Sequence, residues 1–154
     1  MSCIRFNTPA QMRQLDALKE SPALANQAVA AFLSPEITES KIARLVTMAA
    51  DRRPKIRESA ALNIHTPAEV FAVLARDPEE SVRVCVARNE ATPCDVLRGL
   101  ASDKSEEVRS WVAINFFVPA DAMKALANDP SERVRQLVAW KSSLTPEAQL
   151  ASTS

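Results

Sequence analysis

Apolar residues recur along this chain in short runs at helical spacing, with polar turns between the runs. In the middle of the chain, Val70, Phe71 and Leu74 form one apolar stripe, and Val82 and Val86 form a second one. Residues three and four apart lie on the same face of a helix, so each run predicts a short amphipathic helix. Two such short helices and two tight turns form the predicted unit. Each helix is too short to be stable alone in water.

This unit returns with a period of 26 residues. The residues that recur are Asp51, Asp77, Asp103 and Asp129; the pairs Ile56-Arg57, Val82-Arg83, Val108-Arg109 and Val134-Arg135; Ala61, Ala87, Ala113 and Ala139; Asn63, Asn89 and Asn115; and Pro67, Pro93 and Pro119. A fixed period in this range is typical of stacked helical repeats, in which neighbours bury each other's apolar faces. The sequence therefore predicts an all-α, right-handed α-solenoid of about four two-helix repeats.

The repeats are regular over residues 40–143 and degenerate at both ends. Residues 8–39 resemble a degenerate pair of helices, and residues 1–39 are expected to form an N-terminal cap. Residues 144–154 are expected to form a C-terminal cap and tail, with a short helix beginning at Thr145-Pro146. Atypical terminal units are expected of a stacked array, so the whole chain is predicted to be a single repeat domain.

The turn residues predict how each helix begins and ends. Thr66-Pro67 is expected to start a first helix, with the hydroxyl as N-cap, Pro67 at N1 and Glu69 completing a capping box. Asp77 is expected to cap the second helix. Asn89 is expected to end that helix in the left-handed conformation, which asparagine tolerates better than most residues.

Composition narrows the classes of function. Lys plus Arg and Asp plus Glu number 19 each, so the net charge is zero, which argues against nucleic acid or an anionic membrane as the main partner. The N-terminus has no apolar run of signal-peptide length, and Cys3, Cys85 and Cys94 form no CxxC motif. We therefore expect free thiols and a cytoplasmic location.

The pattern Asp-x4-Val-Arg, followed by an alanine-rich second helix and a proline-started first helix, resembles the HEAT-like repeats. The short period and the Asn-x3-Pro junction are similar to the leucine-rich repeat variant (LRV) in particular. The resemblance covers residues 40–141. It implies an α-solenoid that acts as a scaffold, because most members of these families bind other proteins.

Positions that differ between repeats are the ones that stacking does not determine. On the second helices, one such row contains Leu62, Arg88, Ile114 and Trp140, and the flanking row contributes Trp111. Apolar and aromatic residues at such positions often mark partner sites, so these five residues are the predicted partner-binding surface. The alternative is that Trp140 closes the end of the stack and Trp111 fills the edge of the core.

Two further features remain open at this stage. Residues 41–57 carry the one local excess of positive charge, and Arg52, Arg53 and Lys55 could receive a phosphate or an acidic segment. The alternative is a solvated turn. Phe116-Phe117 lies in a predicted turn between helices. The two rings either fill the crevice between units or form a tip that contacts a partner.

No catalytic or metal-binding arrangement stands out. His65 is the only histidine and has no cysteine pair beside it, and Cys94 lies near a helix start without a histidine to activate it. The Asp and Arg rows recur in every unit, whereas an active site would be singular, so we interpret them as a structural ladder between repeats. No cofactor or metal is predicted.

The expected function is a non-enzymatic scaffold that binds another protein or a peptide along the second-helix face. The alternative is a HEAT-like module that binds nucleic acid through the basic edge at residues 41–57. An accessory role beside an enzyme is a further alternative. The sequence leaves the partner and the oligomeric state open.

Overall fold

The computed structural model describes residues 38–144, and within them the chain is all-helical with no strand. Apart from residues 38, 39 and 144, the expected caps lie outside the described residues. The helices are α4 (Glu39–Ala49), α5 (Pro54–Ala61), α6 (Ala68–Leu74), α7 (Glu80–Arg88), α8 (Cys94–Leu100), α9 (Glu106–Ile114), α10 (Ala120–Leu126) and α11 (Glu132–Ser143).

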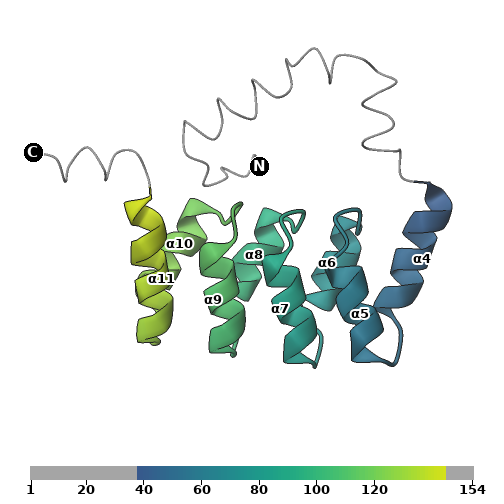
Figure 1. Ribbon diagram of the computed structural model, residues 1–154, viewed down its shortest axis with the longest axis horizontal. Helices are drawn as coiled ribbons and strands as arrows, with labels where there is room; N and C mark the ends of the chain where they lie inside the picture. The colour runs from purple at the N-terminus through teal and green to yellow at the C-terminus, as the bar shows by residue number, and fades with distance from the viewer. Residues whose placement is uncertain (1–37, 145–154) are drawn as a thin grey trace, which may run out of the picture.

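The described helices form two rows. Helices α5, α7, α9 and α11 lie side by side in one row, and α6, α8 and α10 lie behind it (Figure 1). Each member of the first row contacts the next: α5 with α7, α7 with α9, and α9 with α11. Helices that follow each other in the chain form the pairs α4–α5, α6–α7, α8–α9 and α10–α11. Each pair contacts the next one.

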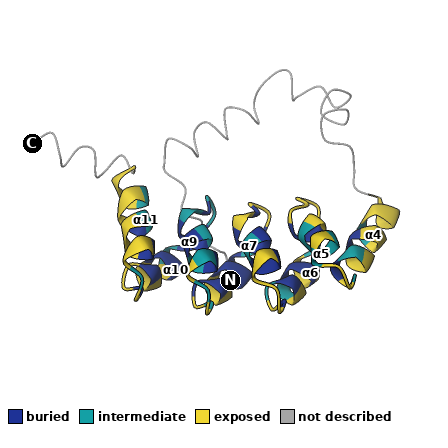
Figure 2. Ribbon diagram, turned by 60° about the horizontal axis from the view of Figure 1, so that its bottom comes forward, coloured by how far each residue is buried: buried dark blue, intermediate teal, exposed yellow. Residues whose placement is uncertain are grey.

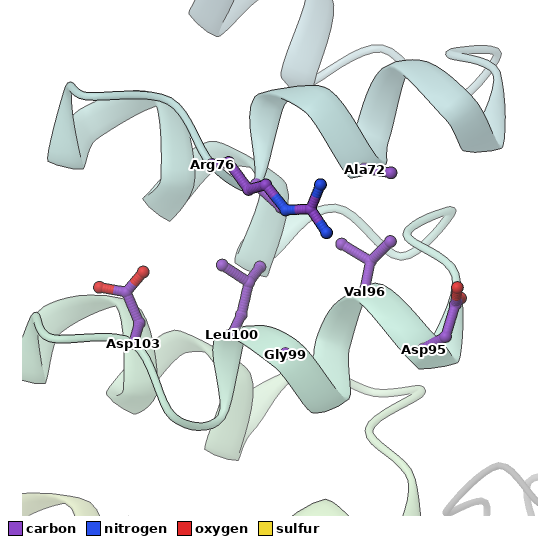
Figure 3. A pocket seen from close by; sticks show the side chains of 8 residues that line it. Ala72, Arg76, Asp95, Val96, Gly99, Leu100 and Asp103 are labelled. Carbon is purple, nitrogen blue, oxygen red and sulfur yellow. The ribbon is translucent and has the colours of Figure 1, made fainter.

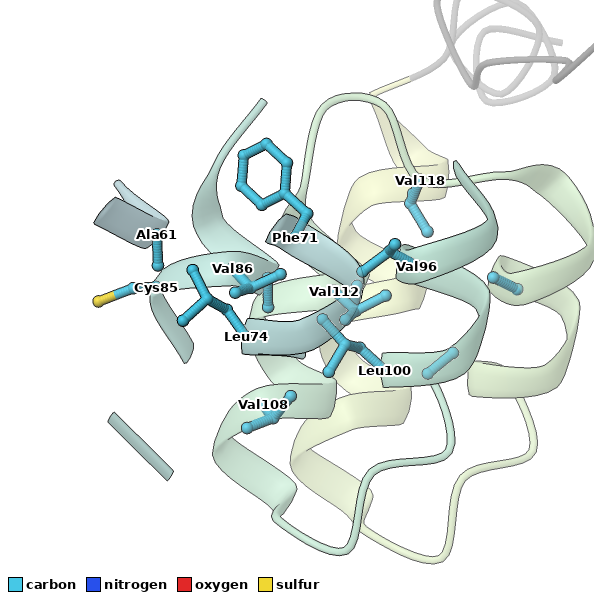
Figure 4. Close-up of a cluster of buried hydrophobic side chains, with 14 of the residues drawn as sticks. Ala61, Phe71, Leu74, Cys85, Val86, Val96, Leu100, Val108, Val112 and Val118 are labelled. Atoms are coloured by element: carbon cyan, nitrogen blue, oxygen red, sulfur yellow. The ribbon is translucent and has the colours of Figure 1, made fainter. Parts of the chain in front are cut away.

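A continuous apolar core runs between the two rows. Phe71 and Leu74 of α6, Val86 of α7 and Val112 of α9 are all fully or almost fully buried (Figure 4). The positions predicted to face inward, Val82 and Val86 among them, are the ones that the structure buries. Fully burying a side chain of this size contributes about 1.5–3 kcal/mol, so the core supplies what short isolated helices lack.

The first-row turns are built on an aspartate placed two residues before the N-cap. Asp77 Oδ1 accepts a hydrogen bond from the backbone N–H of Glu79 at 2.9 Å, and Glu79 is the N-cap of α7. Asp103 binds the N–H of Ser105 in the same way at 2.8 Å. The prediction that the aspartate is itself the N-cap is therefore wrong by two residues, because the carboxylate instead closes the turn that leads into the helix.

Two other predictions about the turns are also wrong. Pro67 is the N-cap of α6 and makes no side-chain cap bond, while Thr66 Oγ1 donates to the carbonyl of Ala60 at 2.6 Å. Its equivalent Thr92 donates to the carbonyl of Val86 at 2.7 Å. The hydroxyl thus satisfies the end of the preceding helix. Asn89 has φ −72° and ψ 125°, so it is extended and not left-handed.

An arginine–aspartate ladder joins successive helix pairs. Nε and Nη2 of each arginine donate to both oxygens of the aspartate 20 residues later: Arg57 to Asp77 at 2.6 and 2.9 Å, Arg83 to Asp103 at 2.8 and 3.1 Å, and Arg109 to Asp129 at 2.7 and 3.0 Å. Nη1 binds carbonyl oxygens of the arginine's own turn, as Arg83 does at Asp77 and Pro78. This geometry agrees with the interpretation of the Asp and Arg rows as a structural ladder between repeats.

An asparagine ladder runs parallel to the first. Asn89 Nδ2 donates to the carbonyl oxygens of Ala61 and Asn63 in the preceding pair, at 2.8 and 3.0 Å. Asn115 repeats this with Ala87 and Asn89. The asparagine recurs because its amide satisfies the carbonyls left at the end of the second helix of the preceding pair.

Among the described residues, none of the helices has the length and apolar character needed to cross a membrane.

Candidate partner-binding surface

The predicted surface lies on the solvent side of α5, α7, α9 and α11, and we call it the second-helix face. Leu62, Arg88 and Trp140 are exposed, with 48% of Leu62 and 56% of Trp140 accessible. Ile114 and Trp111 are half-buried. The alanines that directly precede Leu62, Arg88 and Ile114 are fully buried, so the row lies at the border between core and solvent. In Figure 2, the helices of this row carry both buried and exposed residues.

A chain of side-chain contacts orders the centre of this face. The Arg88 guanidinium lies over the Trp111 ring, 4.6 Å from its centroid, in a cation–π contact between α7 and α9. Trp111 Nε1 donates to Glu107 Oε1 at 3.0 Å, and Arg133 Nη1 of α11 donates to Glu107 Oε2 at 3.3 Å. Three helices thus hold one indole in a fixed orientation, which is favourable for recognition.

An open depression lies beside this chain of contacts, over α5, α7 and the start of α9. It is lined by Lys55, Glu58, Glu79, Glu80, Ser81, Val84, Cys85, Arg88 and Glu107. Lys55 Nζ binds Glu58 at 2.9 Å and lowers the pKa of that carboxyl. The floor carries the apolar groups of Val84 and Cys85, and carboxylates outnumber cations around it. This arrangement suits an amphipathic segment better than an anionic one.

The three residues of the proposed anion site do not form one cluster. Arg53 Nε and Nη2 bind both oxygens of Asp51 at 3.0 and 2.9 Å, and Arg53 holds the pKa of the Asp51 carboxyl at about 2. Lys55 faces the depression described above, whereas Arg52 and Arg53 line a shallow hollow beside Val46 and Ala50. Two of the three cations are therefore paired with carboxylates already.

The phenylalanine pair lies in the turn between α9 and α10. The rings of Phe116 and Phe117 pack edge to face, with centroids 4.8 Å apart, and both residues are half-buried. This packing accounts for part of their apolar surface.

The chemically reactive side chains are scattered. Cys85 is a free, buried thiol, and burial raises its pKa. Cys94 is disulfide-bonded, so the expectation of a free thiol is wrong for this residue; Cys3 lies outside the described residues. His65 is exposed in a turn. Within residues 38–144, no three His, Cys, Asp or Glu residues are grouped closely enough to hold a metal ion.

Sequence reasoning missed a groove on the other row of helices. Between α6 and α8, Ala72, Ala75 and Gly99 leave an open channel that Arg76 borders (Figure 3). Gly99, the only glycine in the chain, was the one sequence feature that could have indicated this groove. A Cβ at Gly99 would meet nothing within 4 Å, so packing does not require glycine there. The groove contains no paired acid and base.

Comparison with known proteins adds no relative: no family model, no curated protein and no solved structure matches this chain.

Proposed function

We propose that this chain is a non-enzymatic scaffold that binds another protein or a peptide along the second-helix face. In this proposal the helix pairs are units of a right-handed α-solenoid related to the HEAT-like and LRV repeats, in the cytoplasm. The two-row arrangement and the ladders between successive pairs support the architecture, because each pair binds mainly its neighbours.

The observation that carries the proposal is the exposure of the row Leu62, Arg88 and Trp140. Stacking buries Ala61 and Ala87 completely, yet it leaves Leu62 and Arg88, which follow them, accessible; Trp140 is exposed together with Ala139. Apolar side chains that gather in an exposed patch often mark a partner site. Trp111, oriented by Arg88 and Glu107, is a rigid aromatic anchor beside them, and aromatic and arginine side chains dominate binding energy at interfaces.

A capture experiment with matched baits tests this function. Wild-type chain, a Leu62→Asp/Trp140→Ala double variant and a Val73→Asp variant are used to retain proteins from a lysate of the source cells. Val73 is an exposed apolar residue of α6, in the other row, so it controls for a general loss of surface hydrophobicity. Circular dichroism first establishes that the three baits are equally folded.

The proposal expects a protein that wild type and Val73→Asp retain and that the double variant loses. Arg88→Glu should also weaken its binding, by about tenfold or more, because it removes the cation over Trp111 and reverses the local charge. Equal recovery by all three baits would contradict the proposal.

Nucleic-acid binding has weaker support. Among the six cations at residues 41–57, Arg53, Lys55 and Arg57 are engaged with Asp51, Glu58 and Asp77. A basic patch in which half of the cations are already neutralised gains less from phosphate contacts.

A further inference from the structure

The groove between α6 and α8 lies in the middle of the described chain, on the row of helices that the second-helix face does not include. Ala72 and Arg76 of α6 line it from one side, and Asp95, Val96 and Gly99 of α8 line it from the other (Figure 3). We call it the α6–α8 groove. Because the chain repeats every 26 residues, the next junction of this row, between α8 and α10, shows what equivalent residues do.

An ion pair present at the next junction is missing from the α6–α8 groove. Between α8 and α10, Arg98 Nε donates to Asp121 Oδ2 at 2.5 Å. The residues 26 positions earlier are Ala72 and Asp95. The side chain of Ala72 ends at Cβ, so no arginine lies opposite Asp95, and α6 and α8 also contact each other less than α8 and α10 do. The groove therefore occupies the place of one missing arginine side chain.

Two unpaired charges border the groove. Asp95 and Arg76 are both exposed, and within residues 38–144 neither of them forms an ion pair. Asp103, a further carboxylate beside the groove, is already bound by Arg83. A ligand that complements the groove thus carries a cation for Asp95 and an anion for Arg76.

The floor between these charges is apolar and has room for a side chain. Val96 and Leu100 are buried, and a Cβ at Gly99 would meet nothing within 4 Å. The groove has a volume of about 260 Å³, which is enough for a long side chain but not for another helix. The aliphatic part of an arginine can lie on such a floor while its guanidinium reaches a carboxylate at the rim.

We propose that the α6–α8 groove binds a segment of a partner polypeptide that carries an arginine beside an acidic residue. The arginine lies over Ala72 and binds Asp95, as Arg98 binds Asp121, and the acidic residue binds Arg76. Opposite charges at the two positions fix the direction of the segment and reject one with the charges exchanged. The site is independent of the second-helix face, and Val73, the control position on α6, does not line it.

A peptide titration followed by NMR tests the proposal. The probe is the peptide acetyl-Ala-Ala-Arg-Ala-Glu-Ala-amide, in which the two charged side chains lie on the same side of an extended backbone. It is added to the full chain labelled with nitrogen-15. The control peptide has citrulline in place of arginine, which keeps the shape of the side chain and removes its charge.

Four variants of the chain locate the site. Asp95→Asn removes the unpaired carboxylate, and Asp121→Asn, its matched control, makes the same change at the junction that Arg98 already fills. Ala72→Arg supplies the missing arginine within the chain, and its pair with Asp95 closes the groove. Gly99→Leu fills the floor. Arginine and leucine are good helix formers and the groove is open, so neither substitution disturbs the core.

The proposal expects saturable shifts of amide signals in α6 and α8. The Kd should rise about fivefold or more for the citrulline peptide and for the Asp95→Asn, Ala72→Arg and Gly99→Leu chains, whereas Asp121→Asn should bind as wild type does. The same spectra report whether each variant is folded. No saturable shift, equal binding of the citrulline peptide, or equal weakening by Asp121→Asn would overturn the proposal.

An arginine of the chain itself is the competing occupant. The arginines outside the described residues are Arg5 and Arg13. The Arg5→Ala/Arg13→Ala chain should bind the peptide as wild type does. Tighter binding by this variant would show that the chain covers its own groove, and it would overturn the assignment to a partner polypeptide.

Discussion

At the scale of the residue, one guanidinium performs two tasks in each ladder arginine. Arg83 closes its own turn through Nη1 and binds the next helix pair through Nε and Nη2. Its side chain is 5% exposed, and that of Asp103 is 9% exposed. Removing one partner of such a pair leaves the other charge buried without compensation, which typically costs about 3–5 kcal/mol.

Arg83→Ala and Arg135→Ala therefore should have different effects. Both remove the bonds to the carbonyls of the arginine's own turn, but only Arg83→Ala strands an aspartate of the next pair. We expect Arg83→Ala to lower the free energy of unfolding by roughly 3 kcal/mol or more, and Arg135→Ala by about 1–2 kcal/mol. Urea denaturation measures both. Equal losses would show that the bond between pairs adds no stability.

Lys141 occupies the position that belongs to asparagine in the preceding pairs. Its Nζ donates to the carbonyl of Asn115, and burial lowers its pKa to about 8. The pKa of lysine in the unfolded chain is about 10.4. Between these two values the unfolded state binds more protons, so the free energy of unfolding should rise as pH increases from about 8 to 10.

The Lys141→Met variant isolates this pH dependence. The difference in stability between wild type and the variant, measured by denaturation at pH 7, 8, 9 and 10, should change in favour of wild type above pH 8. Titration of the other groups cancels in the difference. A constant difference over this range would contradict the assigned pKa.

At the scale of the element, the asparagine ladder can be tested with a control from the same chain. Asn89 is buried and satisfies two carbonyls of the preceding pair, whereas its equivalent Asn63 is exposed and binds only the N–H of His65 through its side chain. We expect Asn89→Ala to lower the free energy of unfolding by about 2 kcal/mol, since one buried and one part-buried carbonyl lose their donor. Asn63→Ala should cost less than half as much, as measured by thermal or urea unfolding.

Sequence predicted the helices better than it predicted their ends. Apolar spacing identified the buried side of each helix, because burial of Val82, Val86 and Phe71 dominates the local energy. The roles of Thr66, Asp77 and Asn89 were misassigned, because each makes a bond to a neighbouring segment or turn that local capping rules do not include. The recurrence of these residues was visible, but their partners were not.

For the candidate surface too, the sequence identified positions but not the contacts between them. The period identified the row of Leu62, Arg88, Ile114 and Trp140 as independent of stacking. Leu62, Arg88 and Trp140 are exposed in the structure, whereas Ile114 is half-buried. The contact of Arg88 with Trp111 was not predicted, because it depends on how far α7 and α9 are offset. The grouping of Arg52, Arg53 and Lys55 could not be tested without knowing that Asp51 and Glu58 lie beside two of them.

At the scale of the whole molecule, a net charge of zero limits the long-range attraction of polyanions. We expect no saturable binding to duplex DNA, even at low salt, in a fluorescence anisotropy titration. Binding that falls steeply with added salt and is lost in Arg44→Glu/Arg52→Glu would instead support the basic edge as a nucleic-acid site.

Contact between the second-helix face and a partner in the cell can be measured by photo-crosslinking. Source cells express the chain with benzoylphenylalanine at position 136 or, as control, at position 73. Position 136 is exposed on α11, one helical turn before Trp140, and position 73 is exposed on α6 in the other row. Replacing Gln136 leaves Leu62, Arg88, Trp111 and Trp140 in place. We expect a discrete adduct from position 136 that is absent from position 73. Adducts from position 73 alone, or none from position 136, would contradict binding at this face.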